Sequence, residues 1–241
     1  MELSVIIPAY NEEKRIGKTL REVTAYCRKN FAKYEIIVVD DGSSDKTKDV
    51  VMKFKGVRLL RNPVNKGKGY SVRRGLMEAR YGWALFTDSD LATPISELKK
   101  FFNYTKQGFD VVIASRNLKE SDIKDRQPFY RQFLGKGFPR LVNLLVLRDF
   151  KDTQCGFKLF KTEKIKRMLP YLTLDRFCFD VELLLVAKKA GLKIKEAPVT
   201  WIDQKGSKLR VFKDTGKMFL DLIRIKLNDL SGKYEVDKNG C

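Results

Sequence analysis

Leu3-Ser4-Val5-Ile6-Ile7-Pro8, near the start of the chain, is a short and mostly apolar run from which the fold class can be inferred. A run of this length, closed by a proline, is typical of a strand buried on both faces of a parallel sheet. Asn11 follows and acidic residues come directly after it, so the pattern predicts a helix that Asn11 caps. The apolar residues of that helix recur at helical spacing as far as Cys27. The chain therefore opens with a strand, a loop and a helix.

The same order repeats through the first half of the chain. Further strands are predicted at residues 35–39, 57–60, 83–87 and 110–114, with helices between them. Repeated units of this kind predict an α/β fold, with a Rossmann-like, mostly parallel sheet flanked by helices. Ligands of such sheets bind beyond the carboxyl ends of the strands. We therefore expect functional residues in the loops that follow these strands.

The regular alternation stops after Arg116. A broken helix is predicted over 129–147, a strand at 157–160, a helix near 180–190, strands near 193–196 and 199–202, and an amphipathic helix over 211–230. We expect one domain over residues 1–210, with halves at 1–116 and 117–210, and a C-terminal accessory helical tail over 211–241. The apolar stripe of the tail predicts packing either on the domain or on a membrane surface, and 129–147 favours a membrane interface.

Composition limits the chemistry. The 241 residues include 49 Lys and Arg against 30 Asp and Glu, a net charge of +19, and no histidine. Histidine-based nucleophile systems and histidine metal sites are therefore excluded. The four scattered cysteines indicate reduced thiols and a cytoplasmic protein. The sequence has no signal-peptide pattern and no apolar run of the roughly 20 residues that cross a bilayer. The positive charge favours a polyanionic or membrane-surface partner.

Acidic residues follow three of the predicted strands: Glu12, then Asp40 and Asp41, then Asp88 and Asp90. A single acid in such a place is commonly a turn or cap residue, but these three groups converge on one edge of the sheet. The spacing of Asp88 and Asp90 can direct one carboxylate to a divalent cation and the other to a hydroxyl or ribose. Mg²⁺ or Mn²⁺ takes oxygen ligands and bridges to substrate phosphates. The sequence thus predicts a metal and phosphate site at this edge.

Four stretches together resemble the family 2 glycosyltransferases of the GT-A fold. They are Ser4-Val5-Ile6-Ile7-Pro8-Ala9-Tyr10-Asn11-Glu12, Val38-Val39-Asp40-Asp41-Gly42-Ser43-Ser44-Asp45, Asn65-Lys66-Gly67-Lys68-Gly69 and Asp88-Ser89-Asp90. Two later stretches, residues 152–160 and 206–209, are similar to the dolichyl-phosphate glucosyltransferase branch, beside the dolichyl-phosphate mannose synthases. The resemblance spans nearly the whole chain, and it implies a nucleotide-sugar half at 1–116 and an acceptor half at 117–210.

The resemblance also implies roles for individual residues. Asp90, with Asp88, would hold Mg²⁺ or Mn²⁺ on the donor diphosphate, Asp88 would lie near the ribose and Asp41 would bond the base. Some mannose synthases supply a further ligand where Ala92 stands here, which argues against the mannose branch. The expected nucleotide-binding residues are Pro8, Ala9, Tyr10, Glu12, Asp41, Lys68, Asp88 and Ser89.

A lipid phosphate acceptor suits a protein without histidine. Its second pKa is near 6, so at neutral pH it is a nucleophile that needs cationic contacts and no general base. Arg116, Arg131 and Lys208 are the candidate contacts, and with Asp90 they form the expected catalytic set. Were the acceptor a hydroxyl, an acceptor-side carboxylate would have to be the base. The candidate acceptor-side residues are Asp152, Gln154, Asp180, Glu182 and Ser207.

These observations lead us to expect an inverting hexosyltransferase. It would move glucose from UDP-glucose to a polyprenyl or dolichyl phosphate, as a peripheral protein at the cytoplasmic face of a membrane. Use of GDP-mannose and transfer to a hydroxyl of a glycan or glycolipid remain open alternatives. A nucleic-acid-binding protein would also explain the charge, but RNP-like aromatics, zinc ligands and a recognition helix are absent from the sequence. The sequence does not determine the lipid length or the oligomeric state.

Overall fold

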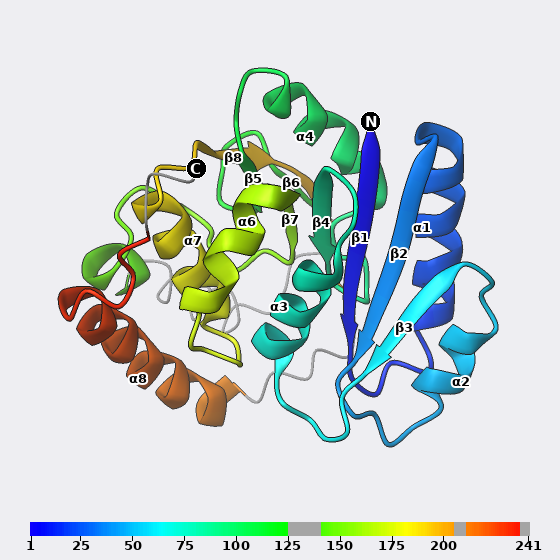
Figure 1. Cartoon of the computed structure of the whole chain (residues 1–241), viewed down its shortest axis with the longest axis horizontal. Coiled ribbons are helices and arrows are strands. Elements are labelled where there is room, and N and C mark those ends of the chain that lie inside the picture. Colours follow the sequence, from blue (N-terminus) through cyan, green and yellow to red (C-terminus); the bar gives the residue numbers. More distant parts are fainter. Residues whose placement is uncertain (125–140, 205–210, 237–241) are drawn as a thin grey trace.

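The computed structural model describes residues 1–124, 141–204 and 211–236, with side chains in the last range described from 216 (Figure 1). The predictions made for Arg131, Ser207, Lys208 and Cys241 lie outside the described residues, as does most of the predicted helix at 129–147. Residues 141–145 are helical, in agreement with the end of that prediction.

A seven-stranded sheet forms the centre of the molecule. Its order is β3-β2-β1-β4-β7-β5-β8, and every neighbouring pair is parallel except those made by β7, which runs antiparallel to both β4 and β5. The mostly parallel sheet predicted from the sequence is confirmed. The strands are β1 (Glu2–Ala9), β2 (Lys33–Asp40), β3 (Val57–Arg61), β4 (Trp83–Thr87), β5 (Val111–Ser115), β7 (Phe157–Lys161) and β8 (Ile194–Pro198).

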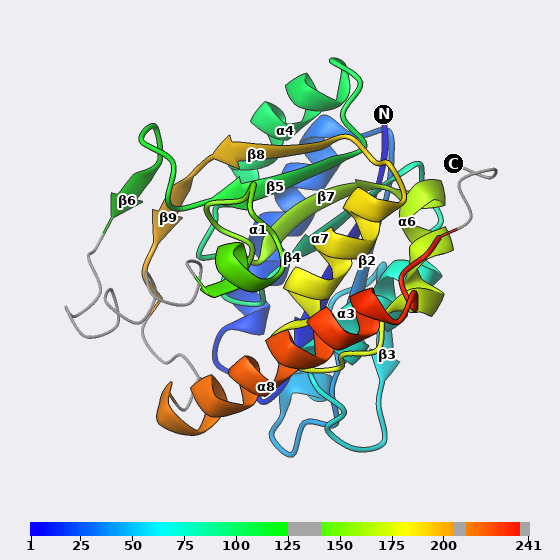
Figure 2. The same cartoon turned by 90° about the vertical axis from the view of Figure 1, so that its left-hand side faces the viewer.

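A second, small sheet extends from the β5 and β8 side of the molecule, as Figure 2 shows. It pairs β6 (Asp122–Lys124) with β9 (Thr200–Ile202) in parallel. Ile202 N–H donates to the carbonyl of Ala92 at 2.8 Å, so this small sheet is tied to the loop after β4. It therefore bounds the edge of the main sheet where functional residues were expected.

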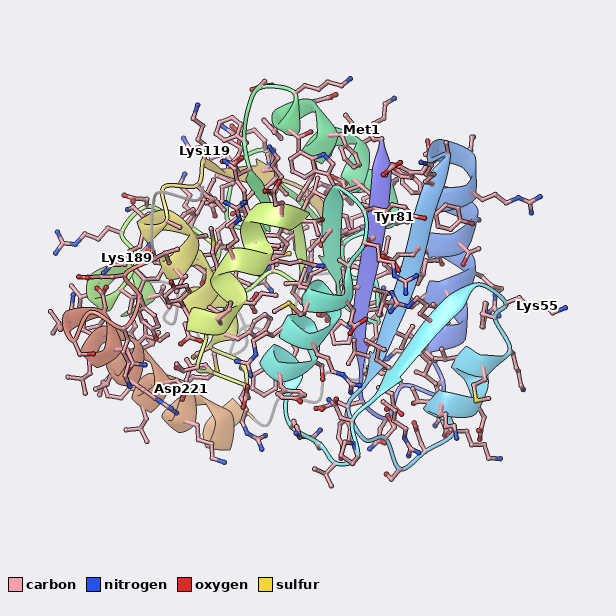
Figure 3. All side chains as sticks on the ribbon, viewed as in Figure 1. Met1, Lys55, Tyr81, Lys119, Lys189 and Asp221 are labelled. Atoms are coloured by element: carbon pink, nitrogen blue, oxygen red, sulfur yellow. The ribbon has the colours of Figure 1, made fainter. Side chains whose placement is uncertain are left out.

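Helices cover both faces of the main sheet. Alternate residues of β1 enter different cores: Leu3, Val5 and Ile7 pack with α1 and α4, whereas Ile6 packs with α3 and α7. Side chains fill the space between the layers (Figure 3). The helices are α1 (Ile16–Asn30), α2 (Thr47–Met52), α3 (Lys68–Glu78), α4 (Leu98–Thr105), α6 (Thr162–Met168), α7 (Phe179–Lys189) and α8 (Val211–Leu230), with 3-10 turns at Ile95–Glu97 and Leu169–Tyr171.

The predicted cap of the first helix is wrong. The helix begins at Ile16, and Asn11 lies in the preceding loop with a left-handed φ of 53°. Its side-chain oxygen accepts a hydrogen bond from the N–H of Ser44 at 2.8 Å, in the loop after β2. Asn11 therefore connects two neighbouring loops, because a short polar side chain tolerates this conformation and can bond the adjacent backbone.

The C-terminal helix packs on the domain along one face. Met218, Leu222 and Ile225 of α8 are buried in the core formed with α7. Beyond the helix, the buried Tyr234 hydroxyl donates to the Glu182 carboxylate at 2.7 Å. In the part of the chain that the structure describes, no helix has the length and apolar character to span a membrane.

Candidate active site

The predicted acidic residues gather at one edge of the main sheet. β1, β2, β4 and β5 run in the same direction and all end at this edge, and Figure 1 shows the ends of β1 and β2 at the lower side of the view. Ala9 lies opposite Asp40 in the β1–β2 register, and the N–H of Asp41 donates to the carbonyl of Ala9 at 2.8 Å. Because parallel strands end together, loops distant in sequence meet here, as the sequence predicted.

Asp41 holds the glycine turn in place. Its Oδ1 accepts from the Asn62 amide at 2.7 Å and from the Lys66 N–H at 3.0 Å, and its Oδ2 accepts from the Gly67 N–H at 2.8 Å. Gly67 has a φ of 111°, and a Cβ on it would lie 2.3 Å from the Asp175 carbonyl oxygen. Only glycine fits this turn. Contact of Asp41 with a base stays a prediction.

Asp88 is fixed from two sides. Its carboxylate lies 2.6 Å from Lys68 Nζ, and its N–H donates to the carbonyl of Gly156 at 3.0 Å. A Cβ at Gly156 would lie 2.0 Å from Asp88 Oδ2, so a glycine is required for the carboxylate to take this position. Asp88 and Lys68 were predicted from the sequence, whereas Gly156 was not, although a glycine in a turn is a signal of a close backbone approach.

The loop that carries Ser89 and Asp90 is tightly bonded to its neighbours. The Ser89 carbonyl accepts from the Thr19 hydroxyl at 2.6 Å, and Asp90 Oδ1 accepts from the Ala92 N–H at 3.1 Å. Leu91 has a left-handed φ of 47°, which is strained for a bulky residue and is found most often at functional sites. The loop thus holds Asp90 in a defined place at a strained turn.

Burial and the nearby Asp88 charge raise the pKa of Asp90, although the Ala92 N–H, Lys68 and Arg15 oppose the shift. A cation beside Asp90 would offset both of the effects that raise its pKa. Among the described residues no group of three or more Asp, Glu, Cys or His side chains could hold a metal. Two carboxylates still suit Mg²⁺ or Mn²⁺, because such ions take further ligands from substrate phosphates and water.

The end of β1 and the loop after it hold the other residues predicted to contact the nucleotide. Pro8 and Ala9 are buried, whereas Tyr10 is 38% exposed at the edge of the sheet. Glu12 forms a two-point ion pair with Arg15, at 2.7 and 2.8 Å. The structure therefore brings these residues to the same edge as Asp88 and Asp90, while their contact with a nucleotide stays a prediction.

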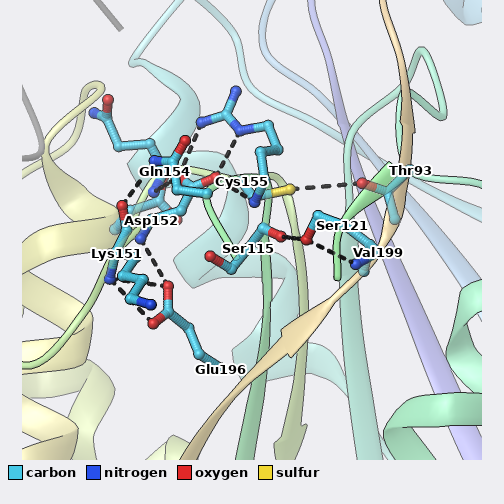
Figure 4. Close-up of polar contacts among 12 residues, drawn as sticks. Thr93, Ser115, Ser121, Lys151, Asp152, Gln154, Cys155, Glu196 and Val199 are labelled. Atoms are coloured by element: carbon cyan, nitrogen blue, oxygen red, sulfur yellow. Dashed lines mark hydrogen bonds and ion pairs between the residues drawn. The ribbon is translucent and has the colours of Figure 1, made fainter. Parts of the chain in front are cut away.

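Arg116 and Asp152 form a second charged group beside this edge. Arg116 Nε and Nη2 bond the two carboxylate oxygens of Asp152 at 2.6 and 2.9 Å, and the Arg116 N–H also donates to it at 3.0 Å. Burial would raise the pKa of Asp152, but the charge and hydrogen bonds of Arg116 lower it. Asp152 N–H in turn donates to Glu196, as Figure 4 shows. The Arg116 guanidinium also lies 5.7 Å from the centre of the Trp201 ring.

Two of the predicted acceptor-side residues are buried and bonded to other groups. Asp180 is 3% exposed and contacts the buried Lys158, which lies opposite Phe86 of β4. Glu182 is fully buried, and its carboxylate accepts hydrogen bonds from Thr173, Leu174 and Tyr234. Contact of either residue with an acceptor stays a prediction. Helical spacing places the two on different sides of α7, which the sequence alone could not orient. Gln154 stays beside Asp152, its N–H donating to that carboxylate at 3.2 Å.

The fold and the site define a class of protein. Paired carboxylates after a central strand, a glycine turn fixed by an acid and an arginine across the edge are suited to a metal-assisted enzyme that acts on a diphosphate-linked substrate. A family model described as glycosyl transferase family 2 matches residues 4–169. The chain therefore belongs to the family 2 glycosyltransferases.

Curated relatives match almost the whole chain. A dolichyl-phosphate beta-glucosyltransferase of Dictyostelium discoideum is 36% identical over 97% of this chain and 76% of its own length. The enzymes of that name from Drosophila melanogaster and Homo sapiens are 38% and 35% identical, each over 98% of this chain and 78% of its own length. These relatives belong to the branch that the sequence motifs resemble.

Solved structures show the same fold. Glucosyl-3-phosphoglycerate synthase from Mycobacterium tuberculosis, crystallised with Mn²⁺, UDP-glucose and phosphoglyceric acid, has a TM-score of 0.70 at 19% identity and covers 95% of this chain and 80% of its own. Mannosyl-3-phosphoglycerate synthase from Rubrobacter xylanophilus has a TM-score of 0.71 at 18% identity, over 98% of this chain and 76% of its own. The GT-A fold expected from the sequence is confirmed.

Proposed function

We propose that this glycosyltransferase moves glucose from UDP-glucose to a polyprenyl or dolichyl phosphate, with inversion at the sugar carbon. The relatives named above support glucose as the sugar and a dolichyl-type phosphate as the acceptor. One observation favours a phosphate acceptor over a hydroxyl acceptor. A hydroxyl would need a general base, and the three carboxylates predicted for that role are all buried and bonded to other groups.

Asp152, Asp180 and Glu182 are 1%, 3% and 0% exposed. Asp152 is bonded through both oxygens to Arg116, and Asp180 contacts Lys158. Glu182 accepts hydrogen bonds from backbone and hydroxyl donors in the core. A general base must reach the proton that it removes. An acceptor that is already an anion avoids this requirement, and a phosphate monoester is such an acceptor.

In the proposed reaction an oxygen of the lipid phosphate attacks the sugar carbon as the bond to UDP breaks. Negative charge then grows on the leaving diphosphate, and a divalent cation there would stabilise it. Asp90 is the expected ligand of Mg²⁺ or Mn²⁺, with Asp88 beside it. Arg116, held rigidly by Asp152, would orient the acceptor phosphate, because a guanidinium matches phosphate geometry.

A lipid acceptor also requires contact with a membrane, and we propose that α8 supplies it. Five large apolar side chains lie exposed on its outer side, here called the outer α8 stripe: Phe219, Leu220, Ile223, Leu227 and Leu230. The helix thus has one apolar face in the core and another toward solvent.

Cations border the outer α8 stripe. Lys217, Arg224 and Lys226 are exposed, and the exposed Leu144 lines the same surface hollow as Lys226. Each Lys or Arg near an anionic bilayer contributes about 1 kcal/mol. The occupant that fits a cation-bordered apolar stripe is an anionic bilayer surface, and we place the protein at the cytoplasmic face of a membrane.

The proposal is tested by a donor and acceptor panel. Purified protein is given a short polyprenyl phosphate or the matching polyprenol, labelled UDP-glucose or GDP-mannose, and Mn²⁺, Mg²⁺ or EDTA. We expect label in the lipid phase only with UDP-glucose, the phosphate and a divalent ion. Labelling from GDP-mannose alone would show that the transferred sugar is mannose. Labelling of the polyprenol would show that the acceptor group is a hydroxyl and not a phosphate.

A further inference from the structure

Two opposite charges are buried behind the Asp88 loop, and the proposed reaction makes no direct use of them. The side chains of Lys158 and Asp180 are 1% and 4% exposed and form an ion pair, and Lys158 Nζ also donates to the carbonyl of Cys155 at 2.8 Å. Removing two charges from water costs more than their attraction commonly returns, so an apolar pair would serve stability at least as well. Stability alone does not account for this pair.

The pair continues into the donor site. Lys158 lies opposite Phe86 in the β4–β7 register, and Lys158 and Lys68 place their Nζ atoms 5.6 and 5.3 Å from the Phe86 ring centre. The Phe86 ring therefore lies between the buried pair and Lys68, in contact with the Nζ atoms of both lysines. Lys68 then contacts Asp88 at 2.6 Å. Two ion pairs, Lys158 with Asp180 and Lys68 with Asp88, thus lie on the same aromatic ring, one in the core and one at the edge of the sheet.

The same lysine anchors the segment that joins the two sides of the site. Residues 152–158 begin with Asp152, which holds Arg116, and continue through Gly156, whose carbonyl accepts from the Asp88 N–H. Lys158 bonds the carbonyl of Cys155, directly before Gly156. One short segment is thus in contact with the acceptor arginine and with the donor carboxylate, and Lys158 fixes its second half.

We propose that Lys158 is a positioning residue for glycosyl transfer. Through the Phe86 ring that both lysines contact, it helps to place Lys68 and hence Asp88. Through Cys155 it fixes the backbone that sets Asp88 relative to Arg116. The ligand that this arrangement serves is the nucleoside diphosphate with its divalent cation. The inference rests on the proposed function for its activity measurement, but its binding measurement needs no acceptor.

The test removes both charges together, because loss of one alone would leave the other buried and unpaired. The variant is Lys158→Met with Asp180→Leu. Its matched control is Lys189→Met with Asp229→Leu, which removes a Lys–Asp pair at the opposite end of α7 (Lys189 is labelled in Figure 3). UDP affinity in the presence of Mn²⁺ is measured by calorimetry, together with the melting temperature and the kcat and KM of transfer.

We expect the Lys158 and Asp180 variant to melt within a few degrees of the wild type, to bind UDP with Mn²⁺ about tenfold more weakly and to lose on the order of 100-fold in kcat. The control should match the wild type in affinity and kcat. A stable variant that binds UDP and turns over like the wild type would overturn the proposal. If the double variant fails to fold, the single variant Asp180→Asn is measured in its place, since it keeps the size of the side chain and removes its charge. Wild-type UDP affinity in that variant would also overturn the proposal.

The proposed coupling between Lys158 and Lys68 is tested by combining substitutions at both residues. In a Lys68→Met background the Lys158 and Asp180 changes should weaken UDP binding little further, because coupled residues are not additive. If the losses in UDP affinity were fully additive, Lys158 would not act on Asp88 through Lys68, and that part of the proposal would be overturned. Wild-type protein that binds UDP with Mn²⁺ yet labels no lipid phosphate would instead refute the proposed function, while the binding comparison would still test Lys158.

Discussion

The proposed donor and acceptor sides of the site, here called the donor side and the acceptor side, are built differently. On the donor side Asp88 pairs with Lys68, and both side chains keep about a quarter to a third of their surface exposed, at 31% and 26%. On the acceptor side Arg116 is bonded through two nitrogens to Asp152, which is 1% exposed. A single lysine contact can give way to a metal and a diphosphate, whereas a two-point contact with a buried acid is rigid. The donor side is arranged to exchange partners and the acceptor side to stay in place.

The largest loss of activity is expected from a substitution on the donor side. Asp90→Ala should reduce transfer by about 1000-fold, because the metal that offsets charge on the leaving diphosphate loses its expected ligand. The melting temperature should stay near that of the wild type. Initial rates at saturating Mn²⁺ measure the loss, and Asp49→Ala, at an exposed acid of α2, is the matched control. Near-normal turnover of the Asp90 variant would remove its metal role.

A smaller loss is expected on the acceptor side. Arg116→Ala should lower transfer about 100-fold with an unchanged UDP affinity, and it should cost about 3 kcal/mol of unfolding free energy because Asp152 is left buried without its partner. Arg116→Lys should recover part of the activity but not the two-point contact. Acceptor KM and UDP calorimetry separate the effects. An equal loss of UDP binding would move Arg116 out of the acceptor site.

The membrane proposal concerns delivery of the acceptor. Leu220→Glu with Leu227→Glu should reduce binding to phosphatidylserine-containing vesicles about tenfold, because both side chains leave an apolar stripe that enters the interface. Activity on a soluble short-chain acceptor should not change. Sedimentation with vesicles is the measurement, and Met52→Glu with Val64→Glu, at exposed apolar residues elsewhere, is the control. Equal binding of both variants and the wild type would refute this surface.

The smallest effect is a shift in a pH profile. Only ionised Asp90 binds a cation, and its pKa is raised by burial and by Asp88, so Mn²⁺ affinity should fall at a higher pH than for an ordinary aspartate. Lys68→Met removes a charge that lowers this pKa, and the profile should therefore move further upward, by less than about one pH unit. Mn²⁺ affinity measured from acidic to neutral pH gives the midpoint. A downward movement would contradict the proposed electrostatics.

Much of the fold could be predicted from local patterns. Apolar runs such as Leu3 to Ile7 are buried on both faces, and the helix predicted at 211–230 is observed at Val211–Leu230. The free thiols were also foreseen, since Cys27, Cys155 and Cys178 are unpaired and buried among the described residues. Such predictions succeed because periodicity and burial are properties of consecutive residues.

Site residues could be predicted where a motif follows directly after a strand, and less well elsewhere. The carboxylates Asp41, Asp88 and Asp90 lie at the expected edge because parallel strands end together. Lys158 was missed, although a lysine inside the apolar strand 157–160 is a signal that could have found it. Asn11 was misplaced because its partners lie in the next loop, and no local pattern reveals them.

Local patterns in the sequence were enough to predict most of the helices and strands and the loops that carry the acidic motifs, because these depend on neighbours along the chain. The antiparallel entry of β7 between β4 and β5 could be seen only in the folded protein. That insertion places Gly156 against Asp88 and Lys158 behind it, while Glu182 of α7 is directed to the core. The physical reason is that a residue's partners across a sheet or helix are set by register and packing, which distant segments fix together.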